Sequence, residues 1–197
     1  DLLVSTTPDQ NVNNNGTVQL IDPLATGQIV QTFNNPESSS FYVDQFGNHM
    51  AVSGNQIIFS AQDNVEDPTN GGAEGPSVLY LYDGSNFLND QGQLRRFEDP
   101  VQNPNFRFGN TIAFEGDTIA VGVSGVQVTI DDTGATTVGS PVYQFNASTG
   151  QLTHTYAQPA SVPYYGNQAY TGWGTGVAIS GNHLLISAPN ALNDAMD

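Results

Sequence analysis

Short stretches of alternating apolar and polar residues recur along the chain and predict β-strands. Residues 28–31 (Gln-Ile-Val-Gln) and 142–145 (Val-Tyr-Gln-Phe) show the alternation of half-buried antiparallel strands. Residues 56–61, 118–123 and 183–188 are more continuously apolar and predict strands that are buried more deeply. No stretch shows a convincing helical period. The pattern therefore predicts an all-β fold.

Three sequence landmarks recur in the same order, which indicates an internal repeat. The first is an aromatic residue followed by glycine, at Phe46-Gly47, Phe108-Gly109 and Trp173-Gly174, with offsets of 62 and 65 residues. The second is a strand-like segment that begins near residues 16, 78 and 142. The third is a segment that begins with Gly-Gln, at residues 27, 92 and 150. The landmarks divide each repeat into four short strands, here called A, B, C and D.

Turn chemistry supports antiparallel hairpins inside each repeat. Ser53-Gly54-Asn55 and Glu115-Gly116-Asp117 separate strands A and B, and both Gly and Asn adopt positive φ at low cost. The first strand expected, Leu2–Ser5, is a strand B, and the last lies at 183–188 and is again a strand B. The expected inventory is thirteen strands, grouped as three, four, four and two.

Repeats of four antiparallel strands are typical of β-propeller blades. We therefore expect an all-β β-propeller segment of about three four-stranded antiparallel blades, spanning residues 1–197. The expected divisions are a partial blade of strands B, C and D, two full blades, and a partial blade of strands A and B, at residues 1–45, 46–107, 108–172 and 173–197. Closed propellers have four to eight blades. The sequence thus favours a segment of a larger propeller over a chain that closes by pairing with other chains.

The sequence resembles the FG-GAP family of repeats, which builds the propeller of integrin α-subunits and of many bacterial surface proteins. The resemblance rests on Phe46-Gly47, Phe108-Gly109 and Trp173-Gly174, with Ser187-Ala188-Pro189 in the place of Gly-Ala-Pro. It covers nearly the whole chain, although the earlier strands B lack the Gly-Ala-Pro ending. The integrin-type calcium loop between strands A and B is not carried over, because the turns here are about two residues long. The closest match is the bacterial variant with short A–B hairpins.

Composition narrows the function classes. The chain has 3 basic and 19 acidic residues, a formal net charge of −16, and no cysteine. Such a charge disfavours nucleic-acid binding, and the absence of cysteine excludes disulfides and thiolate chemistry. The longest apolar runs are too short to cross a bilayer, so no membrane insertion is expected. The charge, together with the resemblance, favours a secreted or cell-surface protein.

Carboxylates gather in the connections between strands B and C. Asp63, Glu66 and Asp67 are the best candidates for a cation site, and calcium is the cation that such oxygen ligands suit. A solvated acidic loop explains the same residues, and no EF-hand spacing is present. No other cofactor is expected.

Aromatic residues gather in the connection before the last repeat. Tyr164, Tyr165 and Tyr170, with Asn167 beside them, suit a platform that binds carbohydrate or protein, or else they pack the loop. Trp173 occupies the phenylalanine position of the repeat and is expected in the core. Asn15 and Asn146 each begin an N-glycosylation triplet.

Catalytic motifs are absent from the sequence. His49, His154 and His183 lie in different strands without a shared spacing, and no nucleophile motif occurs. We therefore expect a non-enzymatic extracellular module for adhesion, scaffolding or blade-to-blade assembly into a larger structure such as a filament. Its partners would be other protein chains, further blades of the same propeller, or carbohydrate. The alternative is a carbohydrate-binding protein or carbohydrate-active enzyme that uses carboxylates on the loop face or in the central channel.

Overall fold

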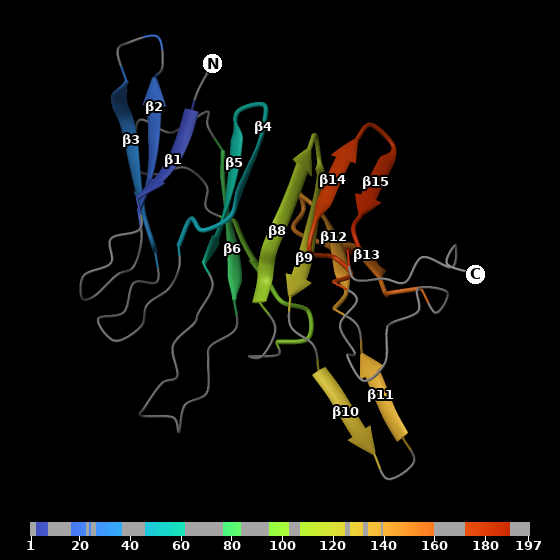
Figure 1. Cartoon of the computed structure of the whole chain (residues 1–197). Helices are drawn as coiled ribbons and strands as arrows, with labels where there is room; N and C mark the ends of the chain where they lie inside the picture. Colours follow the sequence, from blue (N-terminus) through green and yellow to red (C-terminus); the bar gives the residue numbers. More distant parts are fainter. Residues whose placement is uncertain are drawn as a thin grey trace, which may run out of the picture. The chain divides into compact units, whose positions relative to one another are not determined.

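The structure, a computed structural model, describes two compact units, residues 1–104 and 105–197 (Figure 1). The residues it describes are 3–7, 17–22, 24, 27–36, 46–61, 77–83, 95–102, 107–124, 127–131, 134–138, 140–159 and 172–189. Within these ranges the secondary structure consists of β-strands and turns, with no helix. The predicted all-β class is confirmed.

The first unit holds two antiparallel sheets. One contains strands B, C and D of a repeat in the order β1-β2-β3, which are β1 (Leu3–Thr7), β2 (Thr17–Asp22) and β3 (Gln28–Asn34). The other contains strands A to D in the order β4-β5-β6-β7, which are β4 (Met50–Ser53), β5 (Gln56–Ala61), β6 (Val78–Asp83) and β7 (Arg95–Glu98). Each strand pairs with its neighbour in sequence, as expected for an antiparallel blade.

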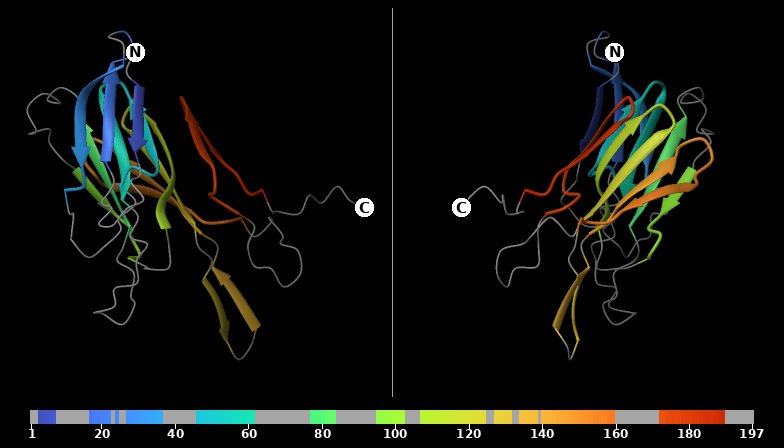
Figure 2. Two further views of the ribbon diagram at one scale, coloured as in Figure 1. Left: turned by 60° about the vertical axis from the view of Figure 1, so that its left-hand side comes forward. Right: turned by 90° about the vertical axis from the view of Figure 1, so that its right-hand side faces the viewer.

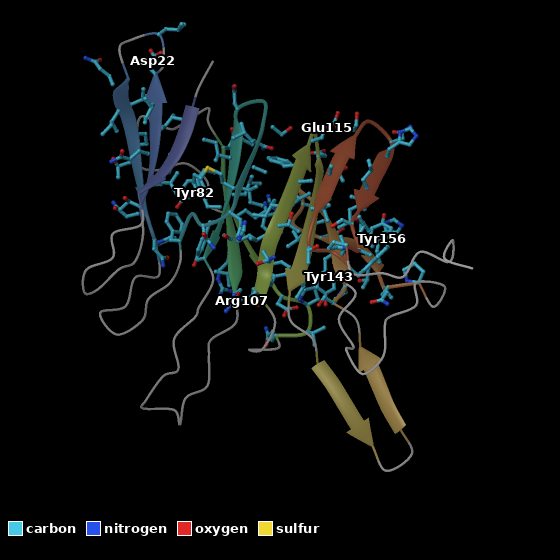
Figure 3. All side chains as sticks on the ribbon, in the orientation of Figure 1. Asp22, Tyr82, Arg107, Glu115, Tyr143 and Tyr156 are labelled. Atoms are coloured by element: carbon cyan, nitrogen blue, oxygen red, sulfur yellow. The ribbon has the colours of Figure 1, made fainter. Side chains whose placement is uncertain are left out.

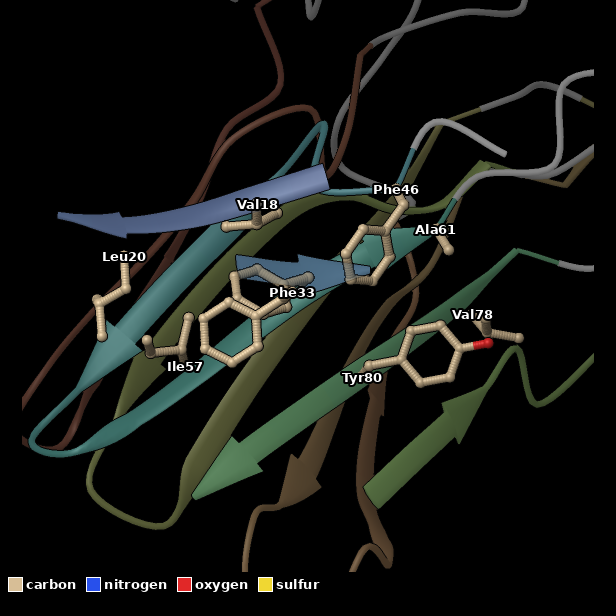
Figure 4. Close-up of a cluster of buried hydrophobic side chains, with 9 residues drawn as sticks. Val18, Leu20, Phe33, Phe46, Ile57, Ala61, Val78 and Tyr80 are labelled. Atoms are coloured by element: carbon tan, nitrogen blue, oxygen red, sulfur yellow. The ribbon is translucent and has the colours of Figure 1, made fainter. Parts of the chain in front are cut away.

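The core of the first unit lies between these two sheets (Figure 4). Val18, Leu20 and Phe33 of the first sheet contribute to the same buried cluster as Ile57 and Tyr80 of the second. The aromatic rings are in contact, with centroids 5.2 Å apart for Phe33 and Phe59. One sheet therefore packs face to face on the next, and this burial of apolar side chains is the main force holding the unit together.

The second unit repeats the four-stranded sheet and adds two hairpins (Figure 2). The sheet has the order β13-β12-β9-β8, from β8 (Arg107–Glu115), β9 (Thr118–Ser124), β12 (Val142–Asn146) and β13 (Leu152–Tyr156). The hairpins are β10 (Gln127–Asp131) with β11 (Gly134–Val138), and β14 (Val177–Ser180) with β15 (His183–Ile186). All thirteen expected strands are found. The ribbon β10–β11 was not predicted, because the whole connection between strands B and C was interpreted as loop.

The register between strands B and C is the same in all three sheets. Ile57 of β5 is paired with Tyr82 of β6, and Ile119 of β9 is paired with Phe145 of β12. Leu3 of β1 is paired with Ile21 at the corresponding position. Because a slip of one residue would turn every side chain to the wrong face, this agreement shows that the repeat specifies its register.

The glycine of each aromatic-glycine landmark has a left-handed backbone. Gly47, Gly109 and Gly174 have φ of 78°, 83° and 76°. The N–H of Gly47 donates to the Ser60 carbonyl at 2.7 Å, and that of Gly174 donates to the Ser187 carbonyl at 2.9 Å. In β8 the register shifts between Phe108 and Thr111, as in a β-bulge. The landmark is thus a bulged start of strand A that requires glycine.

The A–B turns use glycine alone for positive φ. Gly54, Gly116 and Gly181 have φ between 56° and 59°, whereas Gln102 is the one non-glycine residue with positive φ among those described. The following Asn55, Asp117 and Asn182 therefore have negative φ, which corresponds to a type II′ hairpin. The tight hairpins predicted between strands A and B are confirmed.

The end of strand D carries a motif that the sequence analysis missed. In each repeat an aromatic residue is followed, after one residue, by Asn, Asp or Gln and then by Pro. The three copies are Phe33-Asn34-Asn35-Pro36, Phe97-Glu98-Asp99-Pro100 and Tyr156-Ala157-Gln158-Pro159. Asp99 is 1% exposed and Asn35 is 4% exposed. The Asp99 carboxylate accepts the N–H of Val101 at 3.0 Å, and its carbonyl accepts the N–H of Gln102 at 3.0 Å, so the polar residue closes the turn after the strand.

Candidate functional site: the hairpin β14–β15

Most of the candidate site residues lie outside the part of the chain that the structure describes. This holds for the acidic set, the aromatic loop with its asparagine, and one glycosylation triplet: Asp63, Glu66, Asp67, Tyr164, Tyr165, Asn167, Tyr170 and Asn15. Their roles as a calcium site, a binding platform and a glycosylation site stay predictions. Asn146 is the one member of these sets among the described residues.

Asn146 forms the turn between β12 and β13. Its side-chain oxygen accepts the N–H of Thr149 at 2.8 Å, and its carbonyl accepts the N–H of Gly150 at 2.8 Å. Ser148, the third residue of the triplet, donates its hydroxyl to Asp117 at 2.5 Å. The triplet thus serves as a turn in the folded unit, and glycosylation of Asn146 stays a prediction.

The histidines do not come together. His49 is half-buried at the start of strand A, whereas His154 and His183 are exposed. Burial lowers the pKa of His49 below its ordinary value of 6.5. Among the described residues no group of three or more His, Asp or Glu side chains is arranged to hold a metal ion. The described residues form no helix, and so none that is long and apolar enough to cross a membrane.

Trp173 lies just before the hairpin β14–β15 in the chain. Phe46 and Phe108, at the same position of the earlier repeats, are buried, whereas Trp173 is half-buried. Its indole N–H donates to the carbonyl of Tyr156 at 3.3 Å. Trp173 is therefore less buried than the core position predicted for it, and its hydrogen bond connects the hairpin to the end of β13.

The hairpin β14–β15 packs against strands β8 and β9 of its own unit (Figures 1 and 2). A Cβ added to Gly122 of β9 would lie 2.1 Å from the carbonyl oxygen of Gly174, so the absence of a side chain allows the close approach. At the other end of the hairpin, the N–H of Gly181 donates to the carboxylate of Glu115 at 3.0 Å; Figure 3 labels Glu115 beside this turn. Two contacts therefore fix the hairpin at both ends.

The hairpin has an inner and an outer face. The inner face consists of the half-buried side chains Val177, Ile179, Leu184 and Ile186. The outer face consists of the exposed side chains Ala178, Ser180, His183 and Leu185. Leu185 is 60% exposed, whereas Ile58 and Ala120, at the same position of the other two A–B hairpins, are both 0% exposed. The other two hairpins bury this position completely, whereas the apolar side chain of Leu185 is exposed to solvent.

The hairpin also has an open hydrogen-bonding edge. Within the described residues β15 pairs with β14 alone, whereas β1, β5 and β9, the other strands B, each pair with a strand C. The N–H of Ser187 donates toward β14, to the carbonyl of Gly176, at 2.9 Å. Because N–H groups of successive residues point to opposite sides of a strand, those of Leu184 and Ile186 point to the open edge.

The strands D, which form the outer edges of the other sheets, carry features that discourage further pairing. β3 and β13 each have a register shift against their neighbour, and three of the four residues of β7 are charged. Bulges and charges are common ways of blocking an edge strand. β15 has neither: its pairing with β14 is regular, and its sequence is His-Leu-Leu-Ile. Its edge is therefore open to pairing.

Comparisons with known proteins show no family. No protein-family model matches the chain, and no curated protein matches it. Among solved structures, a crystal structure of an ACO/RPE65 chimera is similar to it, with 11% sequence identity and a TM-score of 0.43. The match covers 78% of this chain and 34% of the chimera chain. The chain thus spans about a third of the length of that protein, and the similarity is too low to indicate a function.

Proposed function

We propose that the chain is a non-enzymatic β-blade module that assembles blade to blade with another copy of itself through the hairpin β14–β15. The observation that carries this proposal is the exposed Leu185, at a position where both other A–B hairpins bury their residue completely. Burying a leucine side chain contributes about 1.5–3 kcal/mol, so covering this face favours association.

The packing inside the chain supports blade-to-blade contact as the mode of assembly. In the first unit one sheet covers the apolar face of the next, and in the second unit strand β14 of the hairpin packs against β8 and β9. A further blade that docked on the outer face of the hairpin would continue this face-to-face stacking. Stacked repeats of this kind bury their faces only against neighbours.

We further propose that the repeat is of the FG-GAP type and that the protein is secreted or displayed on the cell surface. The buried aromatic followed by a left-handed glycine, at Phe46-Gly47 and Phe108-Gly109, supports the first proposal. The net charge of −16 and the absence of lysine support the second, because a strongly charged surface stays soluble outside the cell.

Native mass measured by light scattering over a range of protein concentrations tests the proposed assembly. The wild-type chain of 20.9 kDa should associate as its concentration rises, and Leu185→Asp should remain monomeric because it places a charge on the docking face. Leu24→Asp is the matched control, because Leu24 is 85% exposed in the turn after β2 and the variant adds the same charge. A wild-type chain that stays monomeric throughout, or two variants that associate equally, would contradict the proposal.

A further inference from the structure

We propose that the edge of β11 pairs antiparallel with the β11 edge of a second copy, with Thr136 opposite Thr136, so that two β10–β11 ribbons form one four-stranded sheet. This inference rests on the proposed function, because the pairing joins chains that the hairpin β14–β15 has already brought into an assembly. It goes beyond it in assigning a second, separate surface to assembly. Pairing at strand edges is a general mode of protein recognition.

The ribbon β10–β11 is an internal element without a further strand beside it (Figure 1). It lies in the chain between β9 and β12, which pair with each other in the four-stranded sheet. Among the described residues, β10 and β11 pair only with each other, and no other strand is in extensive contact with them. A two-stranded ribbon alone is at best marginally stable in water, whereas three or more strands with an apolar face are stable. Pairing with further strands would therefore stabilise the ribbon.

The register of the ribbon divides its residues into two unlike faces, because alternate residues of a strand share a face. One face holds the apolar positions of β10 and the residues paired with them: Val128, Ile130, Ala135 and Thr137. The other face holds mainly polar positions: Gln127, Thr129, Asp131, Gly134, Thr136 and Val138. A strand added to the ribbon must match this division.

One register pairs β11 with itself along its full length and keeps like faces together. With Thr136 opposite Thr136 of the second copy, Ala135 lies opposite Thr137 and Gly134 lies opposite Val138. A slip of one residue would bring the apolar face of one ribbon beside the polar face of the other. Threonine pairs directly opposite each other also stabilise antiparallel strands. The proposed register therefore gives a four-stranded sheet with one continuous apolar face.

Charge favours β11 over β10 as the edge that pairs. The chain has a net charge of −16, so contact between two copies is opposed by repulsion. The sequence of β11, Gly-Ala-Thr-Thr-Val, contains no charged residue, whereas β10 ends in Asp131. No register shift interrupts the ribbon, so no bulge blocks this edge.

The pairing is weak between single chains and becomes effective between assemblies. The edge of β11 is only five residues long. An assembly formed through the hairpin β14–β15 presents at least two ribbons, and several weak contacts made together raise the overall affinity. Leu185→Asp, which prevents docking, should therefore also prevent the ribbons from pairing.

Disulfide trapping tests the proposed register, because the chain contains no cysteine. In the Thr136→Cys chain, the two cysteines of a ribbon pair have Cα atoms about 4.5–5.5 Å apart, within the range of a disulfide. The matched control is Thr129→Cys, which changes the same residue type at the paired position on β10. Its two copies lie three strand spacings apart in the proposed sheet, about 14 Å, beyond disulfide reach.

Both variants are oxidised with glutathione at concentrations where the wild-type chain associates, and the yield of disulfide-linked dimer is measured. The rate at which each cysteine reacts with a maleimide in the reduced protein normalises the two yields. We expect at least a tenfold higher yield from Thr136→Cys than from Thr129→Cys. Adding Leu185→Asp to the Thr136→Cys chain should lower its yield at least tenfold.

Equal yields from the two cysteine variants, or a Thr136→Cys yield that Leu185→Asp leaves unchanged, would overturn the proposal. If the yields are equal while the wild-type chain associates and Leu185→Asp does not, ribbon pairing is wrong and docking through the hairpin β14–β15 stands. If there is neither preferential cross-linking nor association, both the inference and the proposed function are wrong.

Discussion

Gly122 is the residue at which the smallest change should most affect the placement of the hairpin. A Cβ there would lie 2.1 Å from the Gly174 carbonyl oxygen and 2.2 Å from the Thr111 methyl group. Gly122→Ala should therefore push the hairpin away and destabilise the second unit by about 3 kcal/mol, at the upper end of the range for overpacking. Thermal or denaturant unfolding followed by circular dichroism measures this loss.

The matched control for Gly122→Ala is Gly116→Ala in the same unit. Gly116 has φ of 57°, and a Cβ there would meet nothing within 4 Å, so the cost is backbone strain alone, about 1–2 kcal/mol. If Gly116→Ala proves as destabilising as Gly122→Ala, the close approach of Gly174 to β9 does not govern the stability of the unit.

His49 should make the stability of the first unit depend on pH. Burial lowers its pKa below 6.5, so below that pH the unfolded chain binds a proton more readily than the folded one. The contribution of neutral His49 to stability is complete above about pH 6.5 and is lost as the pH falls through the window below that value. We expect His49→Thr, which introduces the residue found at the equivalent position 111, to reduce the loss of stability between pH 7.5 and 5.

The comparison for His49→Thr is Val52→Thr, which introduces the same residue into β4 at a position that is 50% exposed and removes no titratable group. Urea unfolding at several pH values should give this variant the same dependence on pH as the wild-type chain. A His49→Thr variant that also keeps the wild-type pH dependence would show that burial of the imidazole has no effect on stability.

At the scale of elements, the turn after strand D depends on a buried polar side chain. Asp99 is 1% exposed and accepts the N–H of Val101, while Asn35 is buried at the equivalent position of the first repeat. Asp99→Asn keeps a side-chain oxygen and should change the free energy of unfolding by less than about 0.5 kcal/mol, whereas Asp99→Ala should cost about 0.5–1.5 kcal/mol because it removes the part-buried hydrogen bond from the Val101 N–H. Equal losses for the two variants, measured by denaturant unfolding, would mean that the negative charge of Asp99, rather than its acceptor oxygen, stabilises the turn.

Elements with local signals were predictable from the sequence. The glycine turns between strands A and B and the aromatic-glycine landmarks were found because each depends on a few neighbouring residues. The ribbon β10–β11 also had a signal: residues 127–131 read Gln-Val-Thr-Ile-Asp, which alternates, and a turn sequence at 132–134 follows. It was missed because the four-stranded repeat provides no place for it, so the whole connection was assigned to loop.

At the scale of the whole molecule, the sequence predicted the repeat but not the candidate site. The repeat was visible because equivalent residues recur at a nearly constant offset. The exposed Leu185 could not be identified from the sequence, because its residue type matches that of the buried Ile58, and only packing distinguishes the two. The predicted calcium and aromatic sites depend on residues outside those described, so they remain predictions.

Amide hydrogen exchange at β15 tests the central claim most directly, which is that the chain associates through the hairpin β14–β15. In the dilute chain, the outward N–H groups of Leu184 and Ile186 should exchange rapidly, while those of Ile57 and Phe59, which face β6, exchange slowly. At concentrations where the chain associates, the amides of Leu184 and Ile186 should become at least tenfold more protected. Protection already complete in the dilute chain, or unchanged when it associates, would contradict the account.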